Sequence, residues 1–178
     1  MEFFDVVARR RMHRVFSDEA LTRDDLDRLV RAGARAPQAG NAPVRRFVVV
    51  DEPGIVRTLR QVMPSFISNA PAAIVVCTDL DLVERLMGER GRDTVSRIDA
   101  GTAAENIALA ATALGLGACF SQSSTEPAVR AVLDLPEHVR PEIVVAVGRV
   151  PARPSQAVRM QRPPVDHNRF DSPWEASP

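Results

Sequence analysis

The chain of 178 residues contains neither lysine nor tyrosine, so all 23 of its basic residues are arginine. Without lysine there is no Schiff-base residue, no anchor for pyridoxal phosphate and no lysine for a Walker phosphate-binding loop. Without tyrosine there is no phenolic acid catalyst. An arginine-only basic set is also typical of a GC-rich genome, and we assign the larger share of the bias to that cause.

Cysteine and histidine are scarce as well. The two cysteines, Cys77 and Cys119, each lie in an apolar run typical of a buried strand, where a free thiol acts as a small core residue. Neither CxxC spacing nor a Cys/His ligand set occurs, because His13, His138 and His167 are scattered along the chain. We therefore expect no metal site and no disulfide.

Net charge is zero, while hydrophobic residues make up 45% and charged residues 26% of the chain. This balance is ordinary for a globular protein and favours neither nucleic acid nor a membrane as a partner. No signal peptide and no apolar run long enough to span a bilayer is visible. We therefore expect a cytoplasmic protein.

Helical and strand-like segments alternate along the chain. Apolar periodicity predicts helices over residues 2–11, 22–36, 53–62, 80–90 and 99–116, with one more beginning at 125–127. Thr22 and Asp25 form a capping-box pattern. Apolar runs predict buried strands over residues 47–50, 72–77, 118–121 and 142–147. Such alternation indicates one α/β sandwich with helices on both faces of the sheet.

The predicted helix over 99–116 is unusually rich in alanine and ends at Gly115. So many small side chains imply burial on most sides of the helix. They also allow a second helix to approach closely, which would suit a dimer axis. Composition alone does not decide between a central core helix of a monomer and a dimer axis.

Arginines crowd the end of the first predicted helix, where Arg10, Arg11 and Arg14 surround Met12. Such a run is usually a solvated helix end that interacts with the helix dipole. The alternative is anion capture, because arginine is a planar and permanently charged donor.

Two loops are also candidates. The segment 36–43, Ala-Pro-Gln-Ala-Gly-Asn-Ala-Pro, contains a glycine whose backbone can approach a flat ligand, although alone it reads as an ordinary turn. Ser121 and Gln122 follow a predicted strand and offer amides and hydroxyls, although a helix-capping loop is the simpler interpretation. Asp99 and Glu105 are six residues apart and do not share a helix face, so we discount them as an acid/base pair.

The order and spacing of these motifs resemble the nitroreductase family of FMN-dependent oxidoreductases over nearly the whole chain. Residues 10–16, Arg-Arg-Met-His-Arg-Val-Phe, are similar to the family's Arg-Arg-Ser-x-Arg-x-Phe. Residues 36–41, followed by Arg-Phe-Val-Val at 46–49, are similar to its Ala-Pro-Ser-Ala-Gly-Asn…Arg-Phe-Val-Val. Residues 99–117 resemble its central dimer helix, and residues 140–148 resemble its last core strand.

The resemblance implies a nitroreductase-like α/β (α+β) three-layer sandwich with a central mixed sheet flanked by helices. It implies an FMN-binding domain over residues 1–150. Residues 151–178 would form an extended, proline-rich tail that packs on the partner subunit. It also implies a homodimer with FMN sites at the interface.

Site residues follow from the same resemblance. Arg10, Arg11 and Met12 would contact FMN from one subunit, and Arg14 would lie near the pyrimidine edge of the ring, where a cation stabilises the reduced anion. Pro37, Gln38, Ala39 and Asn41 would come from the other subunit. Ser121 and Gln122 would lie near flavin N5, with the backbone N–H of Gln122 facing it. Arg162 and, more weakly, Arg159 would reach the phosphate from the tail.

The implied activity is passage of hydride from NAD(P)H through flavin N5 to an electron-poor acceptor such as a nitroaromatic or a quinone. No side chain would need to act as a nucleophile or general base. Two alternatives stay open. One is a flavin-dependent oxidase or dehydrogenase of a natural-product or peptide intermediate, or an enzyme that consumes flavin itself. The other is a non-catalytic flavin- or deazaflavin-binding protein.

Overall fold

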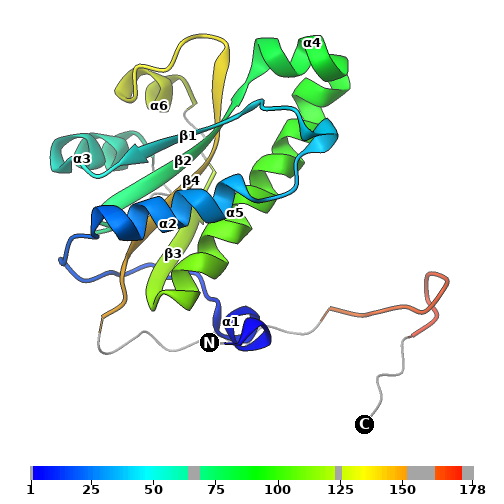
Figure 1. Ribbon diagram of the computed structural model, residues 1–178, viewed down its shortest axis with the longest axis horizontal. Coiled ribbons are helices and arrows are strands. Elements are labelled where there is room, and N and C mark those ends of the chain that lie inside the picture. Colours follow the sequence, from blue (N-terminus) through cyan, green and yellow to red (C-terminus); the bar gives the residue numbers. More distant parts are fainter. Residues whose placement is uncertain (1, 64–68, 123–125, 152–162, 174–178) are drawn as a thin grey trace.

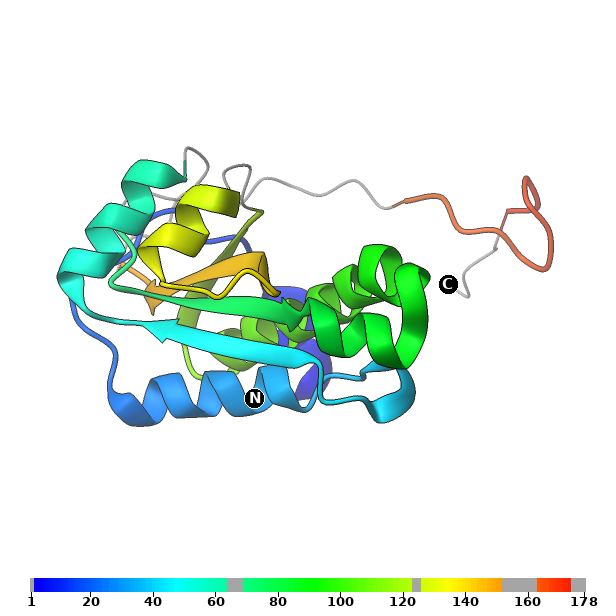
Figure 2. The same cartoon turned by 90° about the horizontal axis from the view of Figure 1, so that it is seen from above.

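A four-stranded sheet lies between two layers of helices (Figures 1 and 2). The computed structural model describes residues 2–63, 69–122, 126–151 and 163–173. The strand order is β1-β2-β4-β3, and every neighbouring pair is antiparallel. The strands are β1 (Arg45–Val50), β2 (Ala72–Asp79), β3 (Leu116–Ser121) and β4 (Val139–Arg149).

Helices cover both faces of this sheet, as the alternating sequence predicts. One face carries α2 (Arg23–Ala34) and α5 (Ser96–Ala113), and the other carries α3 (Pro53–Val62) and α6 (Glu126–Val132). Helix α1 (Phe3–Arg9) packs on α5, while α4 (Leu80–Arg90) and a π-helical turn, η2 (Gly91–Val95), lead into α5. The predicted α/β sandwich is therefore confirmed.

The sheet differs in one respect from the mixed sheet that we expected. Its four strands pair only antiparallel, and a parallel arrangement enters through the isolated bridge between Met12 and Ala118. The prediction of a buried strand over 47–50 is also wrong in part. Val50 is buried, but Val49 is exposed because β1 is an edge strand. Central β2 is buried along nearly its whole length.

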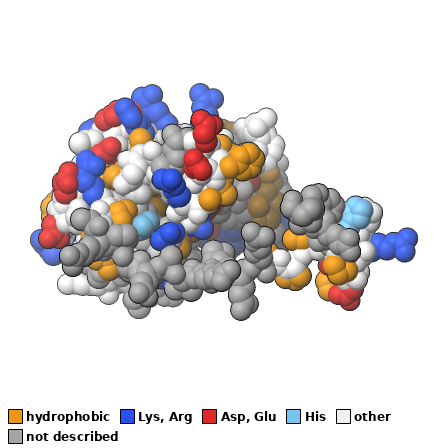
Figure 3. Space-filling model, turned by 90° about the horizontal axis from the view of Figure 1, so that it is seen from below, with side chains coloured by type: hydrophobic (Ala, Val, Ile, Leu, Met, Phe, Trp, Pro, Cys, Tyr) orange, Lys and Arg blue, Asp and Glu red, His pale blue; other side chains and the backbone are white. Residues whose placement is uncertain are grey.

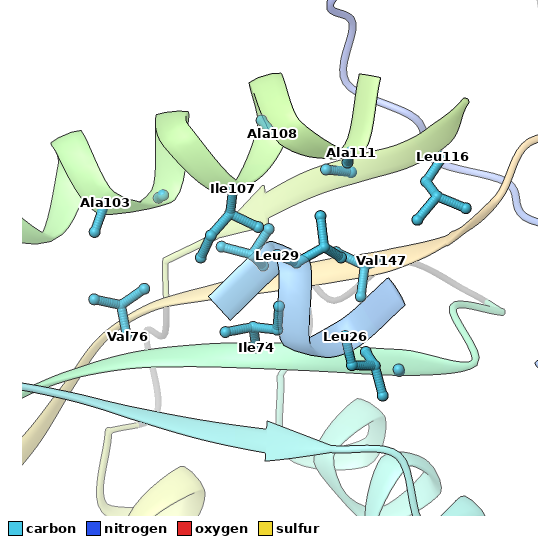
Figure 4. Packing of buried hydrophobic residues seen from close by; sticks show 14 of the residues in the cluster. Leu26, Leu29, Ile74, Val76, Ala103, Ile107, Ala108, Ala111, Leu116 and Val147 are labelled. Atoms are coloured by element: carbon cyan, nitrogen blue, oxygen red, sulfur yellow. The ribbon is translucent and has the colours of Figure 1, made fainter. Parts of the chain in front are cut away.

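Helix α5 forms the main core with α2 and one face of the sheet (Figure 4). Ala103, Ala104 and Ala111 have no exposed surface, so the backbone of α5 lies close to its neighbours. Ile107 is fully buried and fills the space between α5, α2 and the strands. The interpretation of this segment as a core helix is therefore correct, and its outer side still leaves room for a dimer contact.

Local signals place the starts of α2 and α3 where the sequence predicts them, whereas α5 begins three residues before the predicted 99–116. The Thr22 side chain accepts a hydrogen bond from the Asp25 N–H, and the Asp25 carboxylate accepts one from the Thr22 N–H, which completes the capping box. The Glu52 carboxylate accepts hydrogen bonds from the first N–H groups of α3. These caps satisfy donors that a helix leaves free at its N-terminus.

The described part of the tail, residues 163–173, is exposed at every position. It turns back on itself through a bridge between Asp166 and Pro173. None of the helices within the described ranges is long and apolar enough to cross a membrane.

Two leucines on helices of this fold test the assignment of the core. Leu29 of α2 has no exposed surface, whereas Leu86 of α4 is 52% exposed. Leu29→Ala should lower the free energy of unfolding by about 2–5 kcal/mol because it leaves a cavity against α5. Leu86→Ala should change it by about 0.5 kcal/mol. Equal losses in urea unfolding would contradict the core described here.

Candidate functional site

Residues 10–17, which we call the N-terminal strap, run along the free edge of β3. The His13 N–H donates to the Ala118 carbonyl at 2.9 Å, and the Ser17 N–H donates to the Arg149 carbonyl at 2.9 Å. Between them, the Asn69 side chain accepts from the Phe16 N–H and donates to the Phe16 carbonyl. The strap is therefore fixed to the edge strand β3 at His13 and to the end of β4 at Ser17.

The arginine cluster begins at the end of α1, where Arg10 is the C-cap residue, and continues along the strap. Helix α1 ends at Arg9, so the predicted helix over 2–11 is two residues too long, and the interpretation as a helix end holds for Arg10 but not for Arg11 and Arg14. Arg10 Nε lies 3.1 Å from Glu105 Oε1 of α5. Arg11 and Arg14 are exposed. The strap thus presents two guanidinium groups to solvent beside an edge strand.

His13 fits closely against β3. A Cβ atom on Gly117 would lie 2.9 Å from the His13 Cβ and Cγ atoms, so a side chain at 117 would displace the strap. Burial here, together with the charge of Arg11, lowers the pKa of His13 from its ordinary value of 6.5. Met12 packs against the core on the α3 side of the sheet.

The loop 37–41 is held between β1 and α5. The Asp99 carboxylate accepts from the Ala39 N–H at 2.9 Å, and Thr102 Oγ1 donates to the Pro37 carbonyl at 3.3 Å. Arg45 of β1 donates to the same carbonyl at 2.9 Å. Burial lowers the pKa of Arg45, and the charge of Asp99 opposes that shift. These contacts fix the loop at the N-terminal end of α5.

Within the loop, the backbone takes the left-handed conformation at Gly40 (φ 60°) and Asn41 (φ 51°). Glycine adopts this region without cost, which allows the tight turn. The Gln38 amide donates to the Ala42 carbonyl of its own loop, while Pro37 and Asn41 are exposed.

One chain does not bring the strap and the loop together. Arg10 contacts Glu105, whereas Ala39 contacts Asp99, six residues earlier on α5. At 100° per residue these two positions point roughly 120° apart around the helix axis. The same contacts confirm that Asp99 and Glu105 each have a separate partner. The two predicted groups therefore lie on different sides of α5.

Ser121 and Gln122 lie at the end of β3, where Ser121 is buried and Gln122 is exposed. Gln122 lines a cavity of about 170 Å³ together with Phe120, Arg97, Glu142 and Ile143. The sequence reasoning missed Glu142 and its partner Arg140, which are both buried. The sequence did contain a signal for this pair, since two opposite charges lie two residues apart in an otherwise apolar strand.

The remaining predicted residues are the tail arginines and the two cysteines. Arg159 and Arg162 lie outside the described residues. Burial raises the pKa of Cys77 to about 12 and also raises the pKa of Cys119. Both thiols stay protonated near neutral pH, as expected for core residues.

On the face drawn in Figure 3, basic and acidic side chains are interspersed.

Comparison with known proteins agrees with this arrangement. The chain folds as an α/β sandwich in which α5 anchors two segments, the strap and the loop 37–41. The family model described as "Nitroreductase family" matches residues 7–65 and 58–149. The chain belongs to the nitroreductase family, as the motif resemblance indicates.

Individual relatives cover most of the chain. An NADPH-dependent oxidoreductase of Staphylococcus aureus is 30% identical over 179 residues, which cover 92% of this chain and 70% of that protein. The FMN reductase (NADPH) of Bacillus subtilis is 28% identical over 176 residues, covering 86% and 71%. The structure of an FMN-dependent nitroreductase from Clostridium difficile is similar with a TM-score of 0.79, at 25% identity, covering 94% and 99%.

The packing of His13 predicts a pH dependence of stability. Because its pKa is lower in the folded protein than in the unfolded chain, the unfolded chain binds the proton more readily. Stability should therefore fall as pH drops below about 6.5, until the folded pKa is passed. His13→Gln should flatten this part of the profile in urea unfolding between pH 5 and pH 8. His138→Gln, at an exposed histidine, should leave it unchanged, and identical profiles for all three proteins would contradict the burial of His13.

Proposed function

We propose that this protein is an FMN-dependent oxidoreductase that transfers hydride from NAD(P)H to an electron-poor acceptor such as a nitroaromatic or a quinone. The observation that carries the proposal is the N-terminal strap, which holds exposed Arg11 and Arg14 at the free edge of β3. The names of the relatives agree with flavin-dependent NAD(P)H oxidation.

The strap suits an anionic nucleotide. Arg11 and Arg14 make no hydrogen bond or ion pair with another described residue, so their donors are available to a phosphate or to carbonyl oxygens. Arg14 is close enough to β3 for its charge to act on Cys119. A fixed cation there would stabilise negative charge on the pyrimidine edge of a reduced ring. FMN, when bound, supplies the hydride transfer itself.

A homodimer would bring the two separated groups together. The strap and the loop 37–41 lie on different sides of α5, so a site that uses both needs the loop of a second copy. Phe3 and Phe4 of α1 support such a contact, because they are 64% and 82% exposed beside α5. Exposed aromatic side chains of this size commonly mark protein interfaces. Pro37, Gln38, Ala39 and Asn41 would then face the ring from the partner.

The remaining site residues stay predictions. Ser121 and Gln122 end the strand that the strap follows, which would suit contact between the Gln122 N–H and flavin N5. Arg159 and Arg162 would reach the phosphate, with residues 151–178 packed on the partner subunit.

The chain's own side chains would bind and orient the reactants without acting as a nucleophile or base. The thiols of Cys77 and Cys119 are buried, and Asp99 and Glu105 are engaged with Ala39 and Arg10.

The decisive measurement is the visible spectrum of freshly purified protein, followed by anaerobic addition of NADPH. We expect an oxidised flavin spectrum that is lost with NADPH and restored by a nitroaromatic or quinone. Reduction only by a peptide or metabolite would instead support an oxidase or dehydrogenase. Stoichiometric flavin that NADPH does not reduce would support a binding protein. A colourless monomer would contradict the proposal.

Substitution of the strap arginines tests where the nucleotide binds. Arg11→Ala combined with Arg14→Ala should give a folded but largely colourless dimer, because each lost charge-assisted hydrogen bond weakens binding by about 1.5–3 kcal/mol. The matched control combines Arg28→Ala with Arg31→Ala on the exposed side of α2, where each arginine pairs with an aspartate of its own helix. Full flavin occupancy in the strap variant would show that the site lies elsewhere.

A further inference from the structure

A buried ion pair joins β4 to the start of α5. Arg140 and Glu142 both lie on β4, and their side chains are only 8% and 4% exposed. Arg140 Nε and Nη2 donate to the same oxygen, Glu142 Oε1, at 2.9 and 2.6 Å. Replacing a buried pair of this kind with apolar residues often leaves the stability of a protein unchanged or raises it. Stability alone therefore does not explain why two charges are buried here.

Glu142 lies at an irregularity in the sheet. In the pairing of β2 with β4, Val76 faces Ile143 while the next residue, Cys77, faces Pro141. Glu142 is therefore the extra residue of a β-bulge in β4. Bulges are over-represented next to active sites, where they redirect a side chain. The pair thus has a position that is typical of a functional group.

Arg140 fastens the point at which the π-helical turn η2 becomes α5. Its Nη2 atom donates to the Arg92 carbonyl at 2.8 Å and to Ser96 Oγ at 2.9 Å. Ser96, which is 2% exposed, donates from Oγ to the same Arg92 carbonyl at 2.8 Å. One guanidinium therefore connects the bulge, the π-helical turn and the first turn of α5.

The next turn of α5 holds the loop 37–41. Asp99 follows Ser96 by three residues, so the two side chains are neighbours on the helix surface. The Asp99 carboxylate accepts from the Ala39 N–H at 2.9 Å, and Thr102 Oγ1 donates to the same loop at 3.3 Å. Because a packed helix moves as a rigid unit, a shift of its first turn displaces both contacts with the loop.

We propose that the Arg140–Glu142 pair is a positioning device for the loop 37–41 and acts through Ser96 and the first turns of α5. Glu142 fixes the orientation of the guanidinium, the guanidinium fixes the start of the helix, and Asp99 carries that position to the loop. The position of the loop is a property of the single chain. Its consequence, that the pair sets how tightly FMN is held, rests on the proposed function.

Amide hydrogen exchange of the purified protein tests the position of the loop directly. Arg140→Met combined with Glu142→Leu removes the pair without leaving an unpaired charge. We expect the Ala39 amide to exchange about tenfold faster or more, since its hydrogen bond to a charged acceptor is weakened. The amides of β1 and α2 should stay as slow as before, and the urea midpoint of unfolding should be unchanged or higher.

Two reference variants calibrate this measurement. Asp99→Ala removes the acceptor itself and shows how fast the released loop exchanges. The matched control combines Arg130→Met with Glu126→Leu, an ion pair of α6 whose guanidinium also donates to backbone carbonyls. It lies on the other face of the sheet and should leave the Ala39 amide unchanged.

A merely structural pair would behave differently in the same measurement. An unchanged Ala39 amide would overturn the proposal, as would a lower urea midpoint with a uniform rise of exchange across β1 and α2. If the double variant does not fold, Ser96→Ala decides, because it removes only the acceptor on α5. It should speed exchange at Ala39 about two- to tenfold, and an unchanged rate would contradict the proposal.

Titration with FMN separates this inference from the proposed function. Wild-type protein that binds FMN should do so about tenfold more tightly than the Arg140→Met, Glu142→Leu variant, while the α6 control should bind like the wild type. Equal affinity of the wild type and the double variant would overturn the link between the pair and the flavin. Wild-type protein that does not bind FMN would contradict the proposed function, and exchange at Ala39 would still decide whether the pair positions the loop.

Discussion

Helix α5 lies against the sheet through alanine side chains, and this close contact sets the position of the loop 37–41 and of Arg10. Asp99 holds the loop 37–41, Glu105 contacts Arg10 of the strap, and Ser96 accepts from Arg140. Asn106 also donates to the Ala32 carbonyl of α2 at 3.1 Å. A larger side chain on the buried side of α5 would push the helix outward and shift these contacts together.

The same helix explains why a single chain holds only parts of the proposed flavin site. Its residues anchor the strap and the loop on different sides, and the rigid packing of the core prevents either from moving around the helix. A second copy can supply the missing part without any change in fold. In the proposed dimer, the exposed phenylalanines of α1, which packs on α5, would give that second copy a surface to cover.

Much of the fold could be predicted because local patterns and tertiary packing agree. The capping box at Thr22, the proline start of α3 and the alanine-rich period of α5 all mark elements that the structure contains. Strand order is a non-local property, which is why the edge position of β1 and the exposure of Val49 were not predictable. The Arg140–Glu142 pair was missed for a similar reason, since the bulge that joins it to the cavity depends on the register between β2 and β4.

The high arginine content does not by itself identify a binding site in this chain, because several arginines donate hydrogen bonds to backbone carbonyls. Arg45 donates to the carbonyls of Gly33, Ala36 and Pro37, and Arg130 donates to those of Pro136, Glu137 and Val139. The planar fork of a guanidinium suits such multiple contacts better than an ammonium group does. Free donors alone do not distinguish Arg11 and Arg14, because Arg23, Arg85 and Arg90 on helices also lack a described carbonyl or carboxylate partner; Arg11 and Arg14 differ in lying on the strap beside β3. In this chain without lysine, arginines such as Arg45 and Arg130 thus complete the fold, and a candidate recognition site is marked by the place of a guanidinium on the strap together with its free donors.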